Sequence, residues 1–412
     1  MKRYSEYKDS GVKWIGEIPG HWKICRTRYL CNINTGDKDT VMKEDNGKYP
    51  FYVRSPKIER INTFSYDGEA ILMAGDGVGA GKVFHYANGK FDYHQRVYNM
   101  HNICGVSGKF MFYFIRDQFH YAMEEKNAKS TVDSVRLPWL KAFPIAIPAQ
   151  EEQEAIVTYL DTKVAKIDEY ISIAEKKIAA LEELKQTIIT EAVTRGIHKD
   201  VPMKDSGVKW IGMIPEHWTV CKMRKSIYEI NIKNNPIKTT QILSLTNKQG
   251  VIPYEDKGNQ GNKAKEDISS YKIAFKDNII MNSMNVIIGS VGLSNYEGCV
   301  SPVYYVYGIR EGTDKHFINY ICQLSFFQKE LRRFAKGILE IRLRVSSKDI
   351  QNTYIALPSL SEQQEIVTYI EAKVASINQL CQAERAQIEK LKEYKQRLIS
   401  DVVTGKVKVT ND

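Results

Sequence analysis

The stretch EEQEAIVTYLDTKVAKIDEYISIAEKKIAALEELKQTIITEAVTR, from Glu151 to Arg195, decides the fold of this chain. Its apolar residues recur at alternating intervals of four and three, and charged residues fill the positions between them. This spacing is typical of the buried seam of a coiled coil. The seam is expected to comprise Leu160, Val164, Ile167, Ile171, Ala174, Ile178, Leu181 and Ile188.

A second copy of the pattern occupies Ser361 to Gly405, and its seam starts 370 − 160 = 210 residues after the first. At about 1.5 Å per residue, each helix should extend on the order of 60 Å. Glu384 interrupts the second seam, and we expect its neighbours Leu380 and Ala383 to carry the apolar stripe there. Two long helices with matching seams most simply pack against each other. They would form a rod that holds two other parts of the structure apart. The second seam comprises Ile370, Val374, Ile377, Cys381, Glu384, Ile388, Leu391 and Leu398.

A second repeat precedes each helix. The segment KDSGVKWIGEIPGHW, from Lys8 to Trp22, returns as KDSGVKWIGMIPEHW, from Lys204 to Trp218, and we name it the SGVKWIG motif. The chain is therefore a tandem duplication in which this motif, a variable body and a long helix follow one another. The two bodies barely resemble each other, which indicates the same task performed on different targets. The expected domains are 1–149, 150–203 with the first helix and a linker, 204–359, and 360–412 with the second helix.

The bodies have the composition of mixed α/β domains. Ala70–Ala74 and Ile279–Met281 are expected to be buried strands that lead into glycine-rich turns. Asn88-Gly89 lies between β-prone runs and predicts a hairpin. Amphipathic helices are expected over Phe110–Lys126 and Lys315–Lys336.

Composition limits the class of protein. The 412 residues carry a formal charge of +10, which fits a surface that meets phosphate. The seven cysteines include no CxxC pair, so we expect reduced cysteines without a zinc site. No apolar run approaches the roughly 20 residues of a membrane span, and the N-terminus lacks a signal-peptide core. We therefore expect a cytoplasmic protein that does not contact the membrane.

The glycine-rich segment GDGVGAGKV, from Gly75 to Val83, superficially resembles a phosphate-binding loop. The Walker pattern requires Gly where Asp76 stands and Ser or Thr where Val83 stands. A dinucleotide-binding loop requires a following helix, whereas strand-forming residues follow here. The segment instead predicts a tight turn that lets Lys82 and backbone amides approach a DNA backbone.

We find no motif for catalysis. The methyltransferase and nuclease patterns are absent from the sequence, and the eight histidines do not have the spacing of metal ligands. We therefore predict no catalytic residue and no metal site, and expect a chain that is not an enzyme by itself.

Basic and polar clusters in both bodies are the candidates for DNA contact, although a solvated basic face is the default interpretation of any such cluster. Arg342 and Arg344 alternate with apolar residues, so a strand there would present both guanidinium groups on one face. The full set of candidates is Lys82, Gln95, Arg96, Lys126, Lys129, Ser130, Asn282, Ser283, Asn285, Ser301, Arg332, Arg333, Lys336, Arg342 and Arg344.

Over essentially its whole length the chain resembles the specificity subunits of type I restriction–modification systems. The resemblance rests on both SGVKWIG motifs, on the segment SMNVIIGSVG, and on the junctions IPAQEEQEAIVTYLDTKVAKID and LPSLSEQQEIVTYIEAKVASIN. The segment Gly337–Ser346 departs from the family by a short insertion. The resemblance implies an α+β fold in which two mixed α/β target recognition domains are separated by two antiparallel helices. These helices would form a coiled-coil spacer in a pseudo-two-fold tandem repeat.

The resemblance also implies the partners. Each recognition domain would read one half of a bipartite target in double-stranded DNA, with half-sites about one helical turn, roughly 34 Å, apart or near it. The helices would bind two modification (methyltransferase) subunits, and restriction (endonuclease/translocase) subunits would join that core. The chain would need no cofactor of its own, because the partner subunits would carry AdoMet, ATP and Mg²⁺. Two other hypotheses are a self-sufficient enzyme and a coiled-coil protein-binding scaffold without DNA specificity.

Overall fold

The computed structural model describes residues 2–127, 134–198, 200–246, 249–258, 264–284, 289–335 and 343–409, with only the backbone at 125–127. The chain divides into two compact units. Unit 1 comprises Met1–Lys176 and Glu384–Asp412, and unit 2 comprises Lys177–Ala383. Among the described residues, no helix combines the length and the apolar character needed to cross a membrane.

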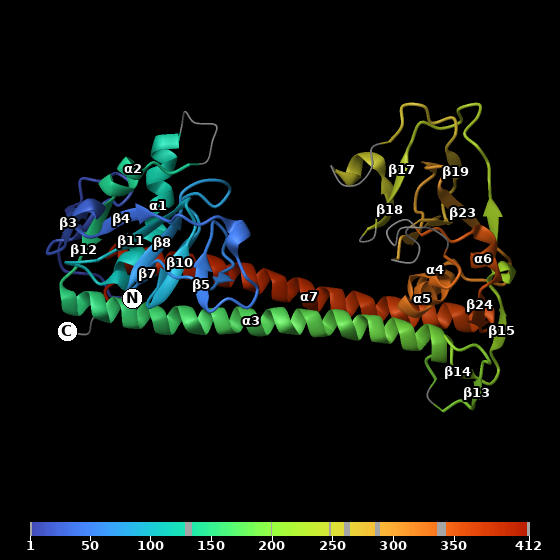
Figure 1. The fold of residues 1–412 in the computed structure, drawn as a ribbon. Coiled ribbons are helices and arrows are strands. Elements are labelled where there is room, and N and C mark those ends of the chain that lie inside the picture. The colour runs from blue at the N-terminus through green and yellow to red at the C-terminus, as the bar shows by residue number, and fades with distance from the viewer. Residues whose placement is uncertain are drawn as a thin grey trace. The chain divides into compact units, whose positions relative to one another are not determined.

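Two long helices contribute to both units (Figure 1). Helix α3 spans Gln150–Arg195 and helix α7 spans Leu360–Val403. In unit 1 the Lys395 ammonium lies 2.6 Å from the Asp168 carboxylate, and in unit 2 the Lys185 ammonium lies 3.3 Å from the Asn378 side-chain oxygen. In each pair, a residue from the first half of one helix lies beside a residue from the second half of the other. Within each unit, α3 and α7 therefore run antiparallel.

The expected seam faces inward on both helices. Leu160 and Ile370 are fully buried, and every other apolar seam residue is at least half-buried. The buried residues are Leu160, Ile167, Ala174, Ile370, Ile377, Cys381, Ile388 and Leu398, and the half-buried residues are Val164, Ile171, Ile178, Leu181, Ile188, Val374 and Leu391.

One detail of the seam prediction is wrong. Glu384 keeps the half-buried seam position, whereas Leu380 is 49% exposed and Ala383 is exposed. The reason is geometric, because each residue turns the helix by about 100° and the flanking seam residues Cys381 and Ile388 fix which side faces inward. A neighbouring leucine cannot replace the acid without rotating the whole helix.

In the described part of the chain, the first body contains two four-stranded sheets. In unit 1 the first sheet is antiparallel, with the order β4 (Asn32–Thr35), β11 (Val97–His101), β8 (Ala70–Ala74), β9 (Phe84–Ala87). The second has the order β6 (Glu59–Ile61), β5 (Tyr49–Tyr52), β10 (Lys90–Tyr93), β7 (Tyr66–Asp67), and only β10 and β5 are parallel. Apolar side chains from both sheets form one cluster, which includes Tyr52, Ala70, Leu72, Phe91, Tyr93 and Val97.

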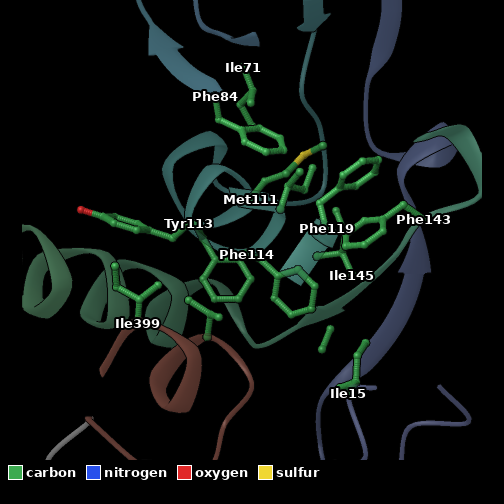
Figure 2. Close-up of a cluster of buried hydrophobic side chains, with 14 of the residues drawn as sticks. Ile15, Ile71, Phe84, Met111, Tyr113, Phe114, Phe119, Phe143, Ile145 and Ile399 are labelled. Atoms are coloured by element: carbon green, nitrogen blue, oxygen red, sulfur yellow. The ribbon is translucent and has the colours of Figure 1, made fainter. Parts of the chain in front are cut away.

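Helix α1 (Gly108–Asn127) supplies much of the main core of unit 1. In Figure 2, Phe114 and Phe119 of α1 lie among side chains of β9, β12 (Pro144–Ile147) and α7, represented by Phe84, Ile145 and Ile399. Strand β12 pairs with β3 (Lys23–Arg26), and the short helix α2 (Leu137–Ala142) precedes it. The core of this unit therefore joins the body to both long helices.

Unit 2 repeats the first sheet of unit 1 with a different sequence, and two separate strand pairs stand in place of the second sheet. The antiparallel sheet has the order β16 (Ile227–Ile230), β23 (Tyr304–Ile309), β20 (Ile279–Asn282), β21 (Val291–Leu293). Strands β17 (Leu243–Thr246) and β18 (Gly250–Pro253) pair, as do β19 (Lys272–Ala274) and β22 (Gly298–Val300). Helices α4 (Lys315–Gln323), α5 (Ser325–Arg332) and α6 (Ser347–Asn352) follow, and β24 (Tyr354–Leu357) pairs with β15 (Thr219–Lys222). The fold class expected from the sequence is confirmed.

Local predictions in the bodies are partly corrected. The hairpin at Asn88-Gly89 is wrong, because β9 joins β8 in the first sheet while β10 joins β5 and β7 in the second. The helix expected from Lys315 is interrupted at Leu324, whose backbone is extended. In both cases the packing of the whole body, rather than the local sequence, determines where the chain turns.

The SGVKWIG motif forms a short hairpin in each unit, β1 (Tyr7–Asp9) with β2 (Glu17–Pro19), and β13 (Met203–Asp205) with β14 (Met213–Pro215). The motif ends on a fully buried tryptophan, Trp22 or Trp218. The Trp22 indole N–H donates to Glu152 at 3.1 Å, and the Trp218 indole N–H donates to Glu362 at 2.9 Å. Both acids belong to the first turns of the long helices, which fixes the motif to the helix in the same way in both units.

A buried glutamine next to each acid attaches the body. Gln153 accepts from the Ser107 backbone N–H at 2.7 Å, and Gln363 accepts from the Asp314 backbone N–H at 2.8 Å. Each glutamine also donates to a proline carbonyl, at 3.0 Å in both units. We name the Glu–Gln pair with its tryptophan the polar clamp, and each unit has one.

The first body contains a buried amide that lacks partners. Asn99 of β11 is fully buried, and neither polar atom of its side chain has a hydrogen-bond partner among the described residues. Asn99 pairs with Leu72 in the register where, in unit 2, Val306 pairs with Ile280. The second body thus places an apolar side chain at the equivalent position.

Replacement of this amide should stabilise the protein. Because an unpaired buried polar group is costly, we expect Asn99→Val to raise the free energy of unfolding by about 1 kcal/mol. Gln153→Leu is the matched control, since it removes a buried amide that has partners and should lower stability by about 1–3 kcal/mol. Urea denaturation of the full chain measures both changes, and a lower midpoint for Asn99→Val would contradict this account.

Candidate nucleic-acid interface

Several chain segments meet at one end of the first sheet of unit 1. The Gly75 N–H donates to the Arg96 carbonyl at 2.9 Å, and the Val135 N–H donates to the Gly75 carbonyl at 2.8 Å. Asp76 and Ser134 form an isolated antiparallel bridge. These backbone bonds hold the glycine-rich turn after β8 against the turn before β11.

The glycine-rich turn depends on its glycines. Gly77 and Gly81 have φ of +71° and +63°, a region that side chains disfavour. A Cβ on Gly79 would lie 2.5 Å from the Arg54 carbonyl oxygen, so the close approach of these segments also requires glycine. Strand β9 follows the turn, as the sequence predicted, and Lys82 is exposed.

Charged side chains gather on this turn. Arg54 Nη1 donates to Asp76 Oδ1 at 2.9 Å, and Arg96 Nη1 lies 3.4 Å from Asp76 Oδ2. The Arg54 and Arg96 side chains are 44% and 63% exposed. The exposed Gln95 donates from its amide to Asp39 at 3.2 Å. This surface therefore offers guanidinium and amide donors, the groups that pair with base edges.

The buried His94 supports the turn from behind. Its Nδ1 accepts from the Arg96 backbone N–H at 2.9 Å. Burial lowers the pKa of His94, which favours the neutral ring that this acceptor role requires. The imidazole thus fixes the backbone that carries the Arg96 side chain.

Gln95 and Arg96 are among the candidates predicted from the sequence, whereas Arg54 and Asp76 are not. In the sequence, Asp76 is distinguished only by its departure from the Walker pattern. Arg54 belongs to no motif, and it stands 22 residues from Asp76 in the chain. Only the tertiary structure brings these residues together.

The equivalent end of unit 2 has the same backbone and different side chains. The Ser283 N–H donates to the Val303 carbonyl at 3.4 Å, and the Val345 N–H donates to the Ser283 carbonyl at 3.2 Å. Asn282 and Ser283 are only 7% and 4% exposed, and the Asn282 side chain accepts from the Met284 N–H at 3.1 Å. The Asn282 side chain therefore holds the turn, and the burial of both side chains does not favour contact with a base edge.

The remaining candidates of unit 2 differ in placement. Ser301 is half-buried at the start of the turn before β23. Arg344 is exposed, with Nη2 lying 3.8 Å from Met284 Sδ. Arg332 and Arg333 are exposed at the end of α5, and Arg333 pairs with Glu330 at 2.9 Å. Six candidates lie outside the described side chains, namely Lys126, Lys129, Ser130, Asn285, Lys336 and Arg342.

The two interfaces match position by position. The Val97 N–H donates to the His94 carbonyl and the Tyr304 N–H donates to the Ser301 carbonyl, both at 2.9 Å. Unit 2 therefore has Pro302 and Val303 where unit 1 has Gln95 and Arg96, and it has Met284 where unit 1 has Asp76. One backbone arrangement thus presents two different sets of chemical groups.

In the described part of the chain, no group of three or more His, Cys, Asp or Glu side chains is arranged to hold a metal ion.

Comparison with known proteins agrees with this duplicated architecture. Residues 19–183 and 215–390 each match the type I restriction modification DNA specificity domain. The chain belongs to this family. It contains the family's domain twice in tandem, and DNA target recognition is the function that the family performs.

Individual relatives match over most of their length. The type I restriction enzyme EcoDI specificity subunit of Escherichia coli is 22% identical over 86% of this chain and 82% of its own. The MjaVIII specificity subunit of Methanocaldococcus jannaschii is 23% identical over 98% of both chains.

Solved structures share the fold. A chain from a type I R-M system, studied for complex assembly and conformational transition, has a TM-score of 0.66 at 14% identity, covering 94% of this chain and 98% of that one. The HsdS subunit from Thermoanaerobacter tengcongensis has a TM-score of 0.51 at 16% identity, covering 95% and 98%. The tandem fold is therefore that of specificity subunits.

The turn of the first recognition domain offers a test of this interface. We expect Gly79→Ala to displace the Arg54 segment, because the new Cβ would lie 2.5 Å from a carbonyl oxygen. The affinity for DNA should fall about tenfold or more, while the long helices keep their thermal transition. Gly20→Ala is the control, because its nearest neighbour would be at an ordinary 3.5 Å. Equal DNA affinity of the two variants would show that this turn does not contact DNA.

Proposed function

We propose that this chain is the non-catalytic specificity subunit of a type I restriction–modification complex and acts in the cytoplasm. Each recognition domain reads one half of a bipartite sequence in double-stranded DNA. The observation that supports this most is the equivalence of the two interfaces, in which Gln95 and Arg96 correspond to Pro302 and Val303 on the same backbone turn. Two domains of one fold with different exposed groups suit two different half-sites.

The long helices provide two similar protein-binding surfaces. In unit 1, Tyr170 and Tyr394 are 63% and 47% exposed. Each is close in sequence to one member of the Asp168–Lys395 pair. In unit 2, Leu380 and Leu184 are 49% and 47% exposed beside the Asn378–Lys185 pair. Exposed apolar residues that recur in this way favour binding of two copies of one partner. We propose that these partners are two modification (methyltransferase) subunits.

The partner subunits would then supply the chemistry. AdoMet would bind to the modification subunits, and restriction subunits would add ATP- and Mg²⁺-dependent translocation and cleavage. The formal charge of +10 on this chain would contribute phosphate contacts that hold the complex in register on DNA.

Methylome sequencing tests the DNA-reading role directly. Cells that express this chain with its modification subunit should carry a bipartite methyladenine motif, which should disappear when the gene for this chain is deleted. Replacement of residues 23–149 by the corresponding body of a relative should change one half of the motif and leave the other intact. Cells with the modification subunit alone are the control. Unchanged methylation after deletion would favour a scaffold without DNA specificity.

The stoichiometry of the complex tests the docking surfaces. Tyr170→Asp combined with Tyr394→Asp places charge on the exposed apolar surface of unit 1 and should leave a complex with one modification subunit. Leu184→Asp combined with Leu380→Asp should do the same through unit 2, and all four changes should abolish the complex. Mass photometry measures these masses. Ser172→Asp is the control, because it adds the same charge to an exposed residue of α3 about 200° around the helix from Tyr170. Binding of two subunits by every variant would exclude this surface.

A further inference from the structure

We propose that Arg54, Asp76 and Arg96 form a guanine-reading unit in the first recognition domain. Asp76 orients two guanidinium groups, and each of these groups pairs with the major-groove edge of one guanine in the first half-site. This inference rests on the proposed DNA-reading function and names the base that one half of the target must contain. We call the three residues the Arg–Asp–Arg triad.

The geometry of the triad leaves both arginines able to bind a base. Asp76 uses one carboxylate oxygen for Arg54, at 2.9 Å, and the other for Arg96, at 3.4 Å. A guanidinium group has five N–H donors, so each arginine keeps a pair of donors after the contact with Asp76. Two parallel donors match the O6 and N7 acceptors of guanine, which is the commonest specific contact of arginine with DNA.

The backbone of the triad is fixed from several sides. The Arg96 carbonyl accepts from the Gly75 N–H at 2.9 Å, and the Arg96 N–H donates to the buried His94 ring at 2.9 Å. Asp76 bridges to Ser134, and the Arg54 carbonyl lies against Gly79. Arginine loses much side-chain entropy when it binds, so a carboxylate and a rigid backbone that preorient the guanidinium groups favour binding of a particular base.

Stability alone does not account for the triad. Exposed ion pairs contribute at most about 1 kcal/mol, and two exposed arginines that share one carboxylate leave a net positive charge at the surface. The equivalent positions of unit 2 include Met284 in place of Asp76 and Val303 in place of Arg96. The triad is therefore a property of one recognition domain, as expected for a group that reads one half-site.

Asp76 acts as a positioning residue. A carboxylate can accept a hydrogen bond from the cytosine amino group, but both oxygens of Asp76 already face arginines. Its replacement by asparagine removes one negative charge and weakens the orientation of both guanidinium groups. The expected result combines two opposite effects, a higher affinity for random DNA and a lower preference for guanine. A merely structural role would not produce this combination.

The experiment is selection of binding sites from a random DNA library by the full chain in complex with its modification subunit. The wild-type protein should enrich a bipartite motif with guanines in one half. Arg54→Ala and Arg96→Ala should each relax one guanine position, with discrimination reduced about 10- to 100-fold and the other half-site unchanged. Asp76→Asn should relax both guanine positions.

A matched control and a change of specificity complete the test. Arg28→Ala removes the same charge from an exposed residue that precedes β4, at the end of the sheet opposite Arg96, and should keep the motif. Arg96→Gln retains a planar group that pairs with adenine, so the selected base should change from guanine to adenine at one position. This gain of a new preference cannot arise from a protein that fails to fold.

The outcomes separate the two proposals. If the wild-type protein selects a bipartite motif and all triad variants keep it, with only a weaker dependence of affinity on salt, the arginines contact phosphate and the inference is overturned. If the wild-type protein selects no bipartite motif, the proposed function itself fails, and the triad proposal fails with it. Loss of the guanine preference in one half of the motif alone supports both the proposed function and the triad proposal.

Discussion

The polar clamp at the start of each long helix is the interaction on which the rest of the structure depends. In unit 1, Glu152 accepts from the Trp22 indole at 3.1 Å and lies 2.8 Å from the His21 ring, while Gln153 binds the Ser107 backbone. The tryptophan is fully buried, so the carboxylate that receives its N–H satisfies a donor that would otherwise be costly. Unit 2 repeats the same contacts around Glu362 and Gln363.

The polar clamp explains why only the SGVKWIG motif and the long helices remain similar in sequence between the two halves of the chain. The SGVKWIG motif and the helix starts contact each other through side chains, so each constrains the other. The bodies are attached differently, because Gln153 and Gln363 bind backbone N–H groups of Ser107 and Asp314. A backbone donor is available whatever side chain it carries. The bodies can therefore differ almost completely in sequence without loosening their attachment to the helices.

Local periodicity allowed the long helices to be predicted, and tertiary contacts explain what was missed. The seam was predictable because a spacing of four and three fixes one face of a helix. The hairpin at Asn88-Gly89 was not, because the partners of β9 and β10 lie in separate sheets. Asn282 and Ser283 appeared suitable for base contact by residue type, yet polar residues at a strand end equally well stabilise the turn. The Arg–Asp–Arg triad joins residues that no sequence pattern connects.

The arrangement of backbone bonds around the triad separates specificity from stability. The bond between Gly75 and Arg96 in unit 1 has its counterpart between Ser283 and Val303 in unit 2, and none of these four bonding groups belongs to a side chain. Exposed side chains on such a turn can change at a cost usually within about 0.5 kcal/mol. The turn therefore tolerates exchange of arginine for valine or of aspartate for methionine. A new set of base contacts can arise there while the core, the clamp and the long helices remain as they are.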